Sequence, residues 1–319
     1  MKTIDTITVL DNGGVTDPPF NLALEEFLVR QEECRETILL IYINDPAVVL
    51  GKHQNVLEET DLQRAEEQGV QVVRRISGGG AVYHDHGNLN IGLITSHDPV
   101  HHNNYAHLLE PIVQLLARLG VTAEINDRNS LVLEDGRKIS GSAQFVSRGR
   151  MMTHATLLFD ADLDQLDTLL TPVTPVSASR AVPSVRSRVA NLAPLIPGVP
   201  DVNALAEGLV EAFAGSRPLR RSLNRTEQTG VEDLVRTRYS TWEWRIGRSP
   251  KFSLRLQSAT GGAHVVTFRD GIIVAVDGIG EGGPGGPARL LGRRLEELVG
   301  GNRWSVVGPE RSDNNGEEG

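Results

Sequence analysis

Three consecutive glycines, placed directly after a strand, constrain this chain more than any other feature. The β-branched run 70–73 predicts a strand that ends in Arg74 and Arg75. Ser77 follows, and then the glycines Gly78, Gly79 and Gly80. Glycine lets the backbone approach an anion and point several N–H groups at it, while guanidinium groups supply paired donors. Alternation along a strand puts Arg75 on the side of Ser77 and opposite Arg74. We therefore expect Arg75 to face a ligand, with Arg74 as the less certain partner.

A bulge or wide turn would also explain three glycines between two strands. The stretch lacks the Gly-Lys-Ser/Thr ending of a P-loop and the spaced glycines of a dinucleotide fingerprint. A plain turn, however, needs no dense group of polar side chains beside it. Here that group comprises Tyr83, His84, Asp85, Asn88 and Asn90. The density favours a binding site.

A second candidate is Lys138, on a predicted strand beside the small residues 140–143. Without bulky neighbours, the ammonium can project into a cleft as a point charge for a phosphate. A lysine on a solvated strand face is the alternative. His154, on the following strand, could reach the same cleft. The polar run 51–55 after an earlier strand fits either a ligand edge or a polar loop.

Length and composition limit the class of protein. With 319 residues, 39% hydrophobic and 23% charged, the chain suits one large domain plus a small one in a soluble globular protein. Its apolar runs are too short for a bilayer, and the N-terminus lacks a signal-peptide pattern. We therefore expect a cytoplasmic protein without a membrane partner. The net charge of −9 argues against nucleic acid, although 180–188 is locally basic.

Cysteine and histidine usage argues against several kinds of site. Cys34 is the single cysteine, which excludes an internal disulfide. It continues the apolar stripe of a helix predicted from Pro18, so its expected role is core packing. Four histidines lie within 97–107, but no two-histidine helix face with a carboxylate is present there. We expect a solvated loop and helix start in that region.

Periodicity predicts an α+β protein: a large domain with a mixed, largely antiparallel sheet flanked by helices, and a small C-terminal α+β domain. Residues 81–95 fit a β-hairpin, as do the strands around Asp135-Gly136 and Arg148-Gly149. The Pro/Ser/Thr-rich segment 171–179, with Arg186 and Arg188 beyond it, suits either an anion-binding lid or a surface linker. We expect domains at 1–246 and 247–310, a last helix over 288–299, and a disordered tail at 311–319.

The sequence resembles the lipoate–protein ligase A family, relatives of the biotin–protein ligases, over nearly its whole length. The order and separation of Arg-Arg-x-Ser-Gly-Gly-Gly and Gly-Arg-Lys-Ile-Ser-Gly-Ser-Ala are specific to it. The segments that carry the resemblance are 21–26, 51–55, 74–90, 135–143, 153–158 and 184–189, with 239–244 and 249–252 similar to the junction with the family's C-terminal accessory domain.

The resemblance implies a two-step acyl transfer. Lipoate and MgATP would give lipoyl-adenylate and pyrophosphate, and a lysine of an acceptor domain would then take the lipoyl group as an amide and release AMP. ATP, Mg²⁺ and lipoate are the implied ligands. The implied partners are apo lipoyl-domain proteins, namely E2 subunits of 2-oxoacid dehydrogenases and the glycine cleavage H protein.

By the same resemblance, Lys138 is the catalytic residue, lying between the lipoate carboxyl and the phosphate. The residues implied at the lipoyl-adenylate are Arg75, Ser77, Gly78, Gly79, Gly80, His84, Asn88 and His154. Leu22 and Val82 suit either an apolar wall or simple core. The family commonly has an aspartate, a candidate Mg²⁺ ligand, where this chain has Ser130, and a neutral hydroxyl is a weaker ligand. The metal site therefore stays unassigned, with Asp127 and Asn129 as candidates.

Two other functions compete with the ligase. An octanoyl or lipoyl transferase of the same superfold would need an activated cysteine at the site, and Cys34 is predicted to be buried. A non-catalytic binder of lipoyl domains or lipoyl-AMP is compatible with Ser130. Biotin in place of lipoate is a variant of the ligase hypothesis. The acceptor, the preference between lipoate and octanoate, and the oligomeric state stay open.

Overall fold

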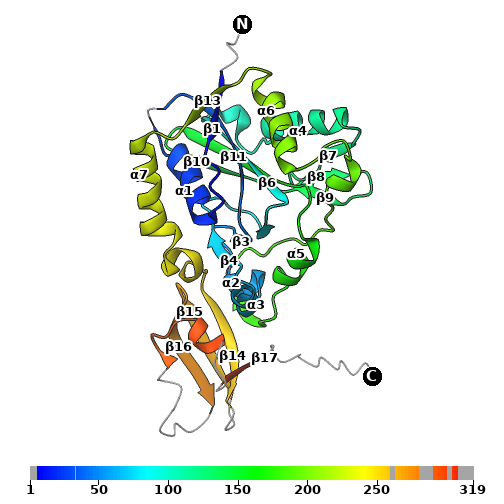
Figure 1. Ribbon diagram of the computed structural model, residues 1–319. Helices are drawn as coiled ribbons and strands as arrows, with labels where there is room; N and C mark the ends of the chain where they lie inside the picture. Colours follow the sequence, from blue (N-terminus) through cyan, green and yellow to red (C-terminus); the bar gives the residue numbers. More distant parts are fainter. Residues whose placement is uncertain (1–5, 33, 259–262, 280–289, 300–303, 308–319) are drawn as a thin grey trace.

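The computed structural model describes residues 6–32, 34–258, 263–279, 290–299 and 304–307. Within them, a mixed six-stranded sheet forms the centre of the larger part of the molecule (Figure 1). In spatial order its strands are β10 (Ser142–Ser147), β11 (Arg150–Leu158), β6 (Asn88–Ser96), β2 (Thr37–Ile43), β1 (Ile7–Asp11) and β13 (Leu219–Ser222). The ladders from β10 to β2 are antiparallel and those involving β1 are parallel. The predicted fold class, α+β with a largely antiparallel sheet, is confirmed.

Side-chain alternation along the central strands separates two cores. Ile38 and Leu40 of β2 pack with α1, whereas Leu39 packs with α4 and α6 on the opposite face. The helices are α1 (Pro18–Val29), α2 (Val56–Glu59), α3 (Leu62–Glu67), α4 (Ala106–Arg118), α5 (Leu163–Leu169), α6 (Val202–Ala214), α7 (Arg225–Leu234) and α8 (Glu296–Val299). Short 3₁₀ turns are η1 (Pro99–His101) and η2 (Ala193–Leu195). The large sheet is thus covered on both faces.

Two small sheets border the large one. One contains β4 (Gln71–Arg74), β3 (Ala47–Leu50) and β5 (Val82–His84), and the other contains β7 (Ala123–Ile125), β8 (Leu131–Leu133) and β9 (Lys138–Ser140). The predicted hairpin over 81–95 is wrong, because β5 pairs with β3 while β6 pairs with β2 and β11. The glycine-containing turn crosses between sheets, and Gly87 has no room for a side chain because a Cβ would lie 1.9 Å from the Asp160 carbonyl oxygen. The hairpins at Asp135-Gly136 and Arg148-Gly149 are confirmed.

A last sheet forms the lower part of the molecule in Figure 1. Its strands are β12 (Val176–Ser179), β14 (Phe252–Ser258), β15 (Ala263–Arg269), β16 (Ile272–Ile279) and β17 (Trp304–Val307). The π-helical segments η3 (Val235–Tyr239) and η4 (Glu243–Gly247) connect it to α7. Its buried side chains share one core with the β3–β4–β5 sheet, where Phe252 and Leu254 join Val48 and Leu50. The C-terminal sheet is therefore packed on the larger part.

Several sequence expectations for this region and for α1 need correction. The segment 171–179 is not simply a lid or linker, because Val176–Ser179 is an edge strand of the C-terminal sheet. Of the helix predicted over 288–299, residues 288–289 lie outside the described residues. The remainder is helical at Glu296–Val299, and Gly292 has a φ of +80° in a turn before it. Helix α1 ends at Val29, so Cys34 lies beyond it, although it does pack against the core as expected. The tail 311–319 lies outside the described residues. No helix among the described residues is long and apolar enough to cross a membrane.

Candidate active site

Two adjoining cavities open beside the glycine loop. The larger has a volume of about 580 Å³ and the smaller about 190 Å³. The residues that line both, and so mark their junction, are Ala81, Val82, Lys138, Gly141, Thr156, Pro183, Ser184, Val185 and Ser187. Strand β9 brings Lys138 to this junction, so that of the two placements the sequence left open, a cleft or a solvated strand face, the lysine occupies the first.

Gly141 leaves the space that the Lys138 ammonium occupies. A Cβ at Gly141 would lie 3.0 Å from Lys138 Nζ. The segment 188–190 holds the backbone of Lys138. The Lys138 N–H donates to the Arg188 carbonyl at 2.8 Å, and the Lys138 carbonyl accepts from the Ala190 N–H at 3.0 Å. Burial, and then the cations Arg75 and Arg128, lower the pKa of Lys138. Positive charge thus accumulates where the cavities meet.

Arg75 lines the larger cavity and also supports the glycine loop. Its Nη2 donates to the carbonyls of Gly78 at 2.6 Å and Gly80 at 2.8 Å, and its Nε donates to Ser77 Oγ at 2.9 Å. Burial lowers the pKa of Arg75 to about 10, which still leaves it charged at neutral pH. Gly79 has a φ of +88°, a conformation that side chains disfavour. Gly79 and Gly80 line the larger cavity, whereas Ser77 is fully buried beneath it.

Arg74 points the other way, as strand alternation predicted, and lines neither of these two cavities. Its Nη1 donates to the carbonyls of Gly51 at 2.9 Å and Gln54 at 2.7 Å. Its Nε donates to the carbonyls of Trp244 at 3.1 Å and Arg245 at 3.3 Å. The side chain is completely buried. Arg74 therefore ties β4 to the 51–55 loop and to η4, and its suggested role as a ligand partner is wrong.

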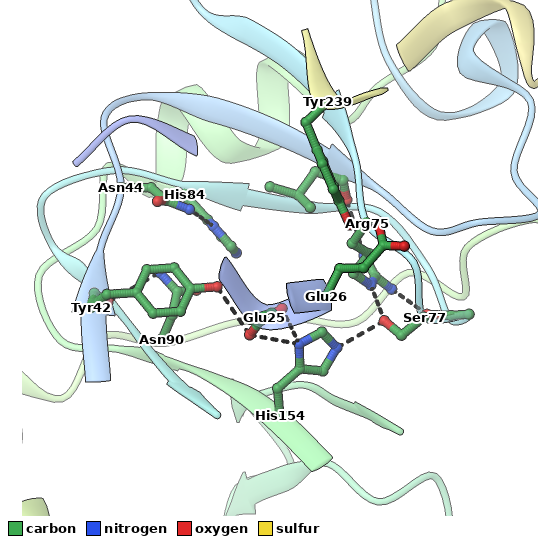
Figure 2. Close-up of polar contacts among 12 residues, drawn as sticks. Glu25, Glu26, Tyr42, Asn44, Arg75, Ser77, His84, Asn90, His154 and Tyr239 are labelled. Atoms are coloured by element: carbon green, nitrogen blue, oxygen red, sulfur yellow. Dashed lines mark hydrogen bonds and ion pairs between the residues drawn. The ribbon is translucent and has the colours of Figure 1, made fainter. Parts of the chain in front are cut away.

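A line of hydrogen bonds joins three residues that line the larger cavity, Glu25, Tyr42 and His154, to Ser77 (Figure 2). His154 Nε2 lies 2.8 Å from Ser77 Oγ, and His154 Nδ1 lies 2.9 Å from a carboxylate oxygen of Glu25. Tyr42 donates to the same carboxylate at 3.1 Å. Glu25 comes from α1, Tyr42 from β2 and His154 from β11. The cluster joins the glycine loop to the sheet and fixes the orientation of the imidazole.

His84 and Asn88 lie on different sides of the junction. His84 lines the larger cavity with Asn90, whereas Asn88 lines the smaller one. Burial, followed by the charges of Arg75 and His154, lowers the pKa of His84 to about 3, so the ring is neutral at physiological pH. Asn88 Nδ2 donates to Asn90 Oδ1 at 3.2 Å. Leu22 and Val82 both belong to the wall of the larger cavity.

The chain at 182–189 lies across both cavities. Ser184 Oγ accepts from the Ala81 amide at 2.8 Å and donates to the Glu59 carboxylate, which also accepts from the Ser184 amide at 3.0 Å. Arg186 lines the smaller cavity, where it donates to the Leu170 carbonyl at 3.0 Å. Arg188 is exposed and is not among the lining residues. The segment therefore covers the cavities, and the hydrogen bonds from Ser184 to Glu59 hold it in place.

The cavity offers little to a metal ion. Ser130 and Asp127 line the larger cavity, and the Asn129 carbonyl accepts a hydrogen bond from Ser142. Among the described residues no group of three His, Cys, Asp or Glu side chains could hold a metal.

Sequence reasoning missed three residues that shape this site: Glu25, Tyr42 and Glu59. Glu25 and Tyr42 looked like parts of an ordinary helix and strand, and Glu59 lay outside the predicted elements. Long-range contacts bring all three to the cavity. A carboxylate inside the apolar stripe of 18–29 was the available signal, since an unpaired buried charge is costly. Ser184 lay inside a segment quoted for the resemblance but was not singled out.

A partly buried lysine at the junction of two cavities, beside a glycine loop on a mixed sheet, is an arrangement that suits an enzyme acting on anionic substrates. A family model described as "Lipoyl protein ligase A/B catalytic domain" matches residues 17–214. This match spans more than half of the chain, and the chain therefore belongs to that family and is an enzyme of the ligase class.

Curated relatives and solved structures agree with the family. Lipoate-protein ligase LplJ of Bacillus subtilis is 40% identical over 250 residues, which are 77% of this chain and 75% of the relative. A putative lipoate protein ligase from Thermoplasma acidophilum with bound lipoic acid matches with a TM-score of 0.65 at 26% identity, covering 76% of this chain and 99% of that chain. A lipoate-protein ligase A bound with ATP matches with a TM-score of 0.64 at 27% identity, covering 77% of this chain and all of that one.

Proposed function

We propose that this enzyme activates lipoate with ATP and transfers the lipoyl group to a lysine of an acceptor domain. In the first step a lipoate carboxylate oxygen attacks the α-phosphorus of ATP, and pyrophosphate leaves. In the second step the acceptor amine attacks the carbonyl carbon of lipoyl-adenylate, an amide forms, and AMP leaves. The position of Lys138 between two adjoining cavities is the observation that carries the proposal.

The two cavities suit the two substrates of the first step. The larger one has apolar wall residues, among them Leu22, Val49 and Val82, and accommodates an acyl chain. The smaller one, crossed by the 182–189 segment, would receive the nucleotide. The carboxylate and the α-phosphate would then meet at the junction. There the resemblance and the geometry both favour Lys138.

Lys138 would act mainly through charge. Two anions must approach in the first step, so a preorganised cation lowers the barrier without further reorganisation. Arg75 and Arg128 add positive potential around it, and the amides of Gly79 and Gly80 line the same cavity. In the second step the ammonium would stabilise the developing oxyanion. We assign Ser77, Gly78 and His154 to shaping the loop and the cavity, and Asn88 to the nucleotide side.

Mg²⁺ would neutralise the phosphate oxygens of ATP. The oxygen ligands around Ser130 fit this ion poorly. Ser130 offers a neutral hydroxyl, and Asp127 beside it offers one carboxylate. We propose that the oxygens of ATP hold the ion. No catalytic step is assigned to a protein-bound metal.

The transferase alternative lacks its nucleophile. An acyl-enzyme would need a thiolate at the cavity, and Cys34 lines neither cavity. Its carbonyl instead accepts a hydrogen bond from Arg150, and its side chain packs against the core. The binder alternative stays compatible with Ser130, and pyrophosphate release separates it from the ligase.

We further propose a catalytic domain at 1–246 and an accessory domain at 247–310, with apo lipoyl domains of E2 subunits or the glycine cleavage H protein as acceptors and the cytoplasm as location. One neighbouring structure is described as a bi-partite lipoate protein ligase and its E2 lipoyl domain, which supports this kind of acceptor. The accessory domain would have to move to admit one. Arg186 and Arg188 would help the 171–188 segment to close over the adenylate.

The complete reaction tests this function. Purified enzyme, MgATP and lipoate are incubated with an apo lipoyl domain, and intact-mass spectrometry follows the acceptor. The expected result is one added lipoyl amide, which disappears when the acceptor lysine is replaced by arginine. An unmodified acceptor in the presence of formed adenylate would contradict the transfer step. Biotin in place of lipoate tests the specificity of the acid.

A further inference from the structure

His84 carries an unpaired hydrogen-bond donor in the wall of the larger cavity. Among the described residues, its Nε2 is the buried, unpartnered side-chain atom that belongs to a residue lining this cavity. The ring is 4% exposed. The polar neighbours are satisfied, since Tyr42 bonds to Glu25 and Asn90 donates to the Tyr42 carbonyl at 3.3 Å. Figure 2 shows His84 with its hydrogen-bond partner Asn44.

A chain of side-chain amides fixes which ring nitrogen carries the proton. The Val15 carbonyl accepts from Asn12 Nδ2 at 2.8 Å and from Asn21 Nδ2 at 2.9 Å, which orients both amides. Asn21 Nδ2 also donates to Asn44 Oδ1 at 2.9 Å. Asn44 must therefore present its Nδ2 to His84 Nδ1, 3.0 Å away. Nδ1 is the acceptor, and Nε2 bears the hydrogen.

The donor lies in the larger cavity, outside its junction with the smaller one. Residues that line both cavities, including Lys138, mark the junction, whereas His84, Tyr42, Glu25 and His154 line the larger cavity alone. If the carboxylate is held at Lys138, an acid that occupies the larger cavity extends its chain among these residues. Polar groups there are unsuited to a saturated alkyl tail.

We propose that His84 is a specificity-determining residue that selects acids with a hydrogen-bond acceptor at the end of the chain, such as the sulfurs of a dithiolane ring, over saturated acids of similar length. The inference rests on the proposed function of the cavity. An alkyl tail displaces water from the Nε2–H and leaves a buried donor without a partner, while a sulfur atom accepts weakly from it. Sites that hold a polar group for the substrate discriminate against analogues that lack the matching atom.

Equilibrium binding tests this without requiring catalysis. Isothermal titration calorimetry with lipoate and with octanoate gives the ratio of their dissociation constants for the wild type, His84→Leu and His84→Gln. We expect the wild type to prefer lipoate, and His84→Leu to reduce the preference on the order of 10-fold or more. His84→Gln places an amide donor near the position of Nε2 and should restore much of it. Val49→Ala enlarges the same cavity without changing its donors and controls for shape.

The outcomes separate this inference from the proposed function. An unchanged ratio in His84→Leu, or an equal loss of affinity for both acids in that variant, would overturn the role of His84. A ratio that Val49→Ala reduces as strongly would also overturn it, since volume alone would then explain the preference. Absence of lipoate-dependent pyrophosphate release in the wild type would contradict the ligase reaction, yet the binding ratios would still decide the role of His84.

Discussion

Arg74 is predicted to hold the C-terminal part of the molecule against the sheet that carries the glycine loop. Arg74→Met removes the guanidinium while keeping a long side chain. It deletes four hydrogen bonds to the carbonyls of Gly51, Gln54, Trp244 and Arg245. A hydrogen bond to a charged group contributes about 1.5 kcal/mol at the low end, so the set contributes about 6 kcal/mol.

Burial of the cation opposes this contribution. It lowers the pKa of Arg74 to about 10, which corresponds to a penalty of about 3 kcal/mol. The variant should therefore lose roughly 3 kcal/mol of unfolding free energy, or on the order of 6–12 °C in melting temperature. Arg220→Met is the matched control. Its ion pair with Glu207 is exposed and contributes less than about 1 kcal/mol.

The assay is thermal unfolding followed by circular dichroism, with limited proteolysis of the 247–258 region in parallel. Arg74→Met should melt earlier than Arg220→Met and should be cleaved faster near η4. Equal melting temperatures for the two variants would refute the reasoning, because the buried hydrogen bonds would then contribute no more than a surface ion pair.

Three further perturbations probe the site. Arg128→Ala should move the alkaline limb of the pH profile of pyrophosphate release to higher pH, because a neighbouring cation lowers the pKa of Lys138; an unmoved limb would exclude this coupling. Gly141→Ala should slow adenylation by roughly 10-fold or more, since the new Cβ would lie 3.0 Å from Lys138 Nζ. Gly198→Ala is the control, because a Cβ there meets open space and should leave the rate unchanged. Equal rates for the two variants would show that Lys138 does not depend on the space at Gly141. Lipoate with ATP should slow proteolysis within 171–188. Glu59→Leu should accelerate this proteolysis, because it removes the acceptor for Ser184. Cleavage that responds to neither change would contradict the role of this segment as a cover of the cavities.

Local rules predicted much of this fold from the sequence. Alternation along a strand placed Arg74 and Arg75 on opposite sides, and the structure gives them separate partners. The start of α1 was predicted at Pro18, and in the structure Asp17 caps the helix there. Glycine turns located two hairpins correctly. In each case the determining interactions lie within a few residues.

The errors arose where distant contacts decide the outcome. The strands on either side of Gly87 looked like a hairpin, yet each found a better partner in a different sheet. Strand β12 was predicted to be part of a lid or a linker because its pairing partner, β14, lies far along the chain. Glu25 of α1 was overlooked for the same reason, since its partners Tyr42 and His154 lie on strands β2 and β11. Periodicity carries no information on such pairings.

The central claim is that Lys138 makes this protein an acid-activating ligase, and pyrophosphate release tests it most directly. Purified wild type, Lys138→Ala and Lys52→Ala are compared in MgATP with and without lipoate. Lys52 is the matched control, because it lines neither cavity. We predict lipoate-dependent release that persists in Lys52→Ala and is abolished in Lys138→Ala with the fold intact. No lipoate-dependent release from the wild type, or near-normal release from Lys138→Ala, would contradict the account.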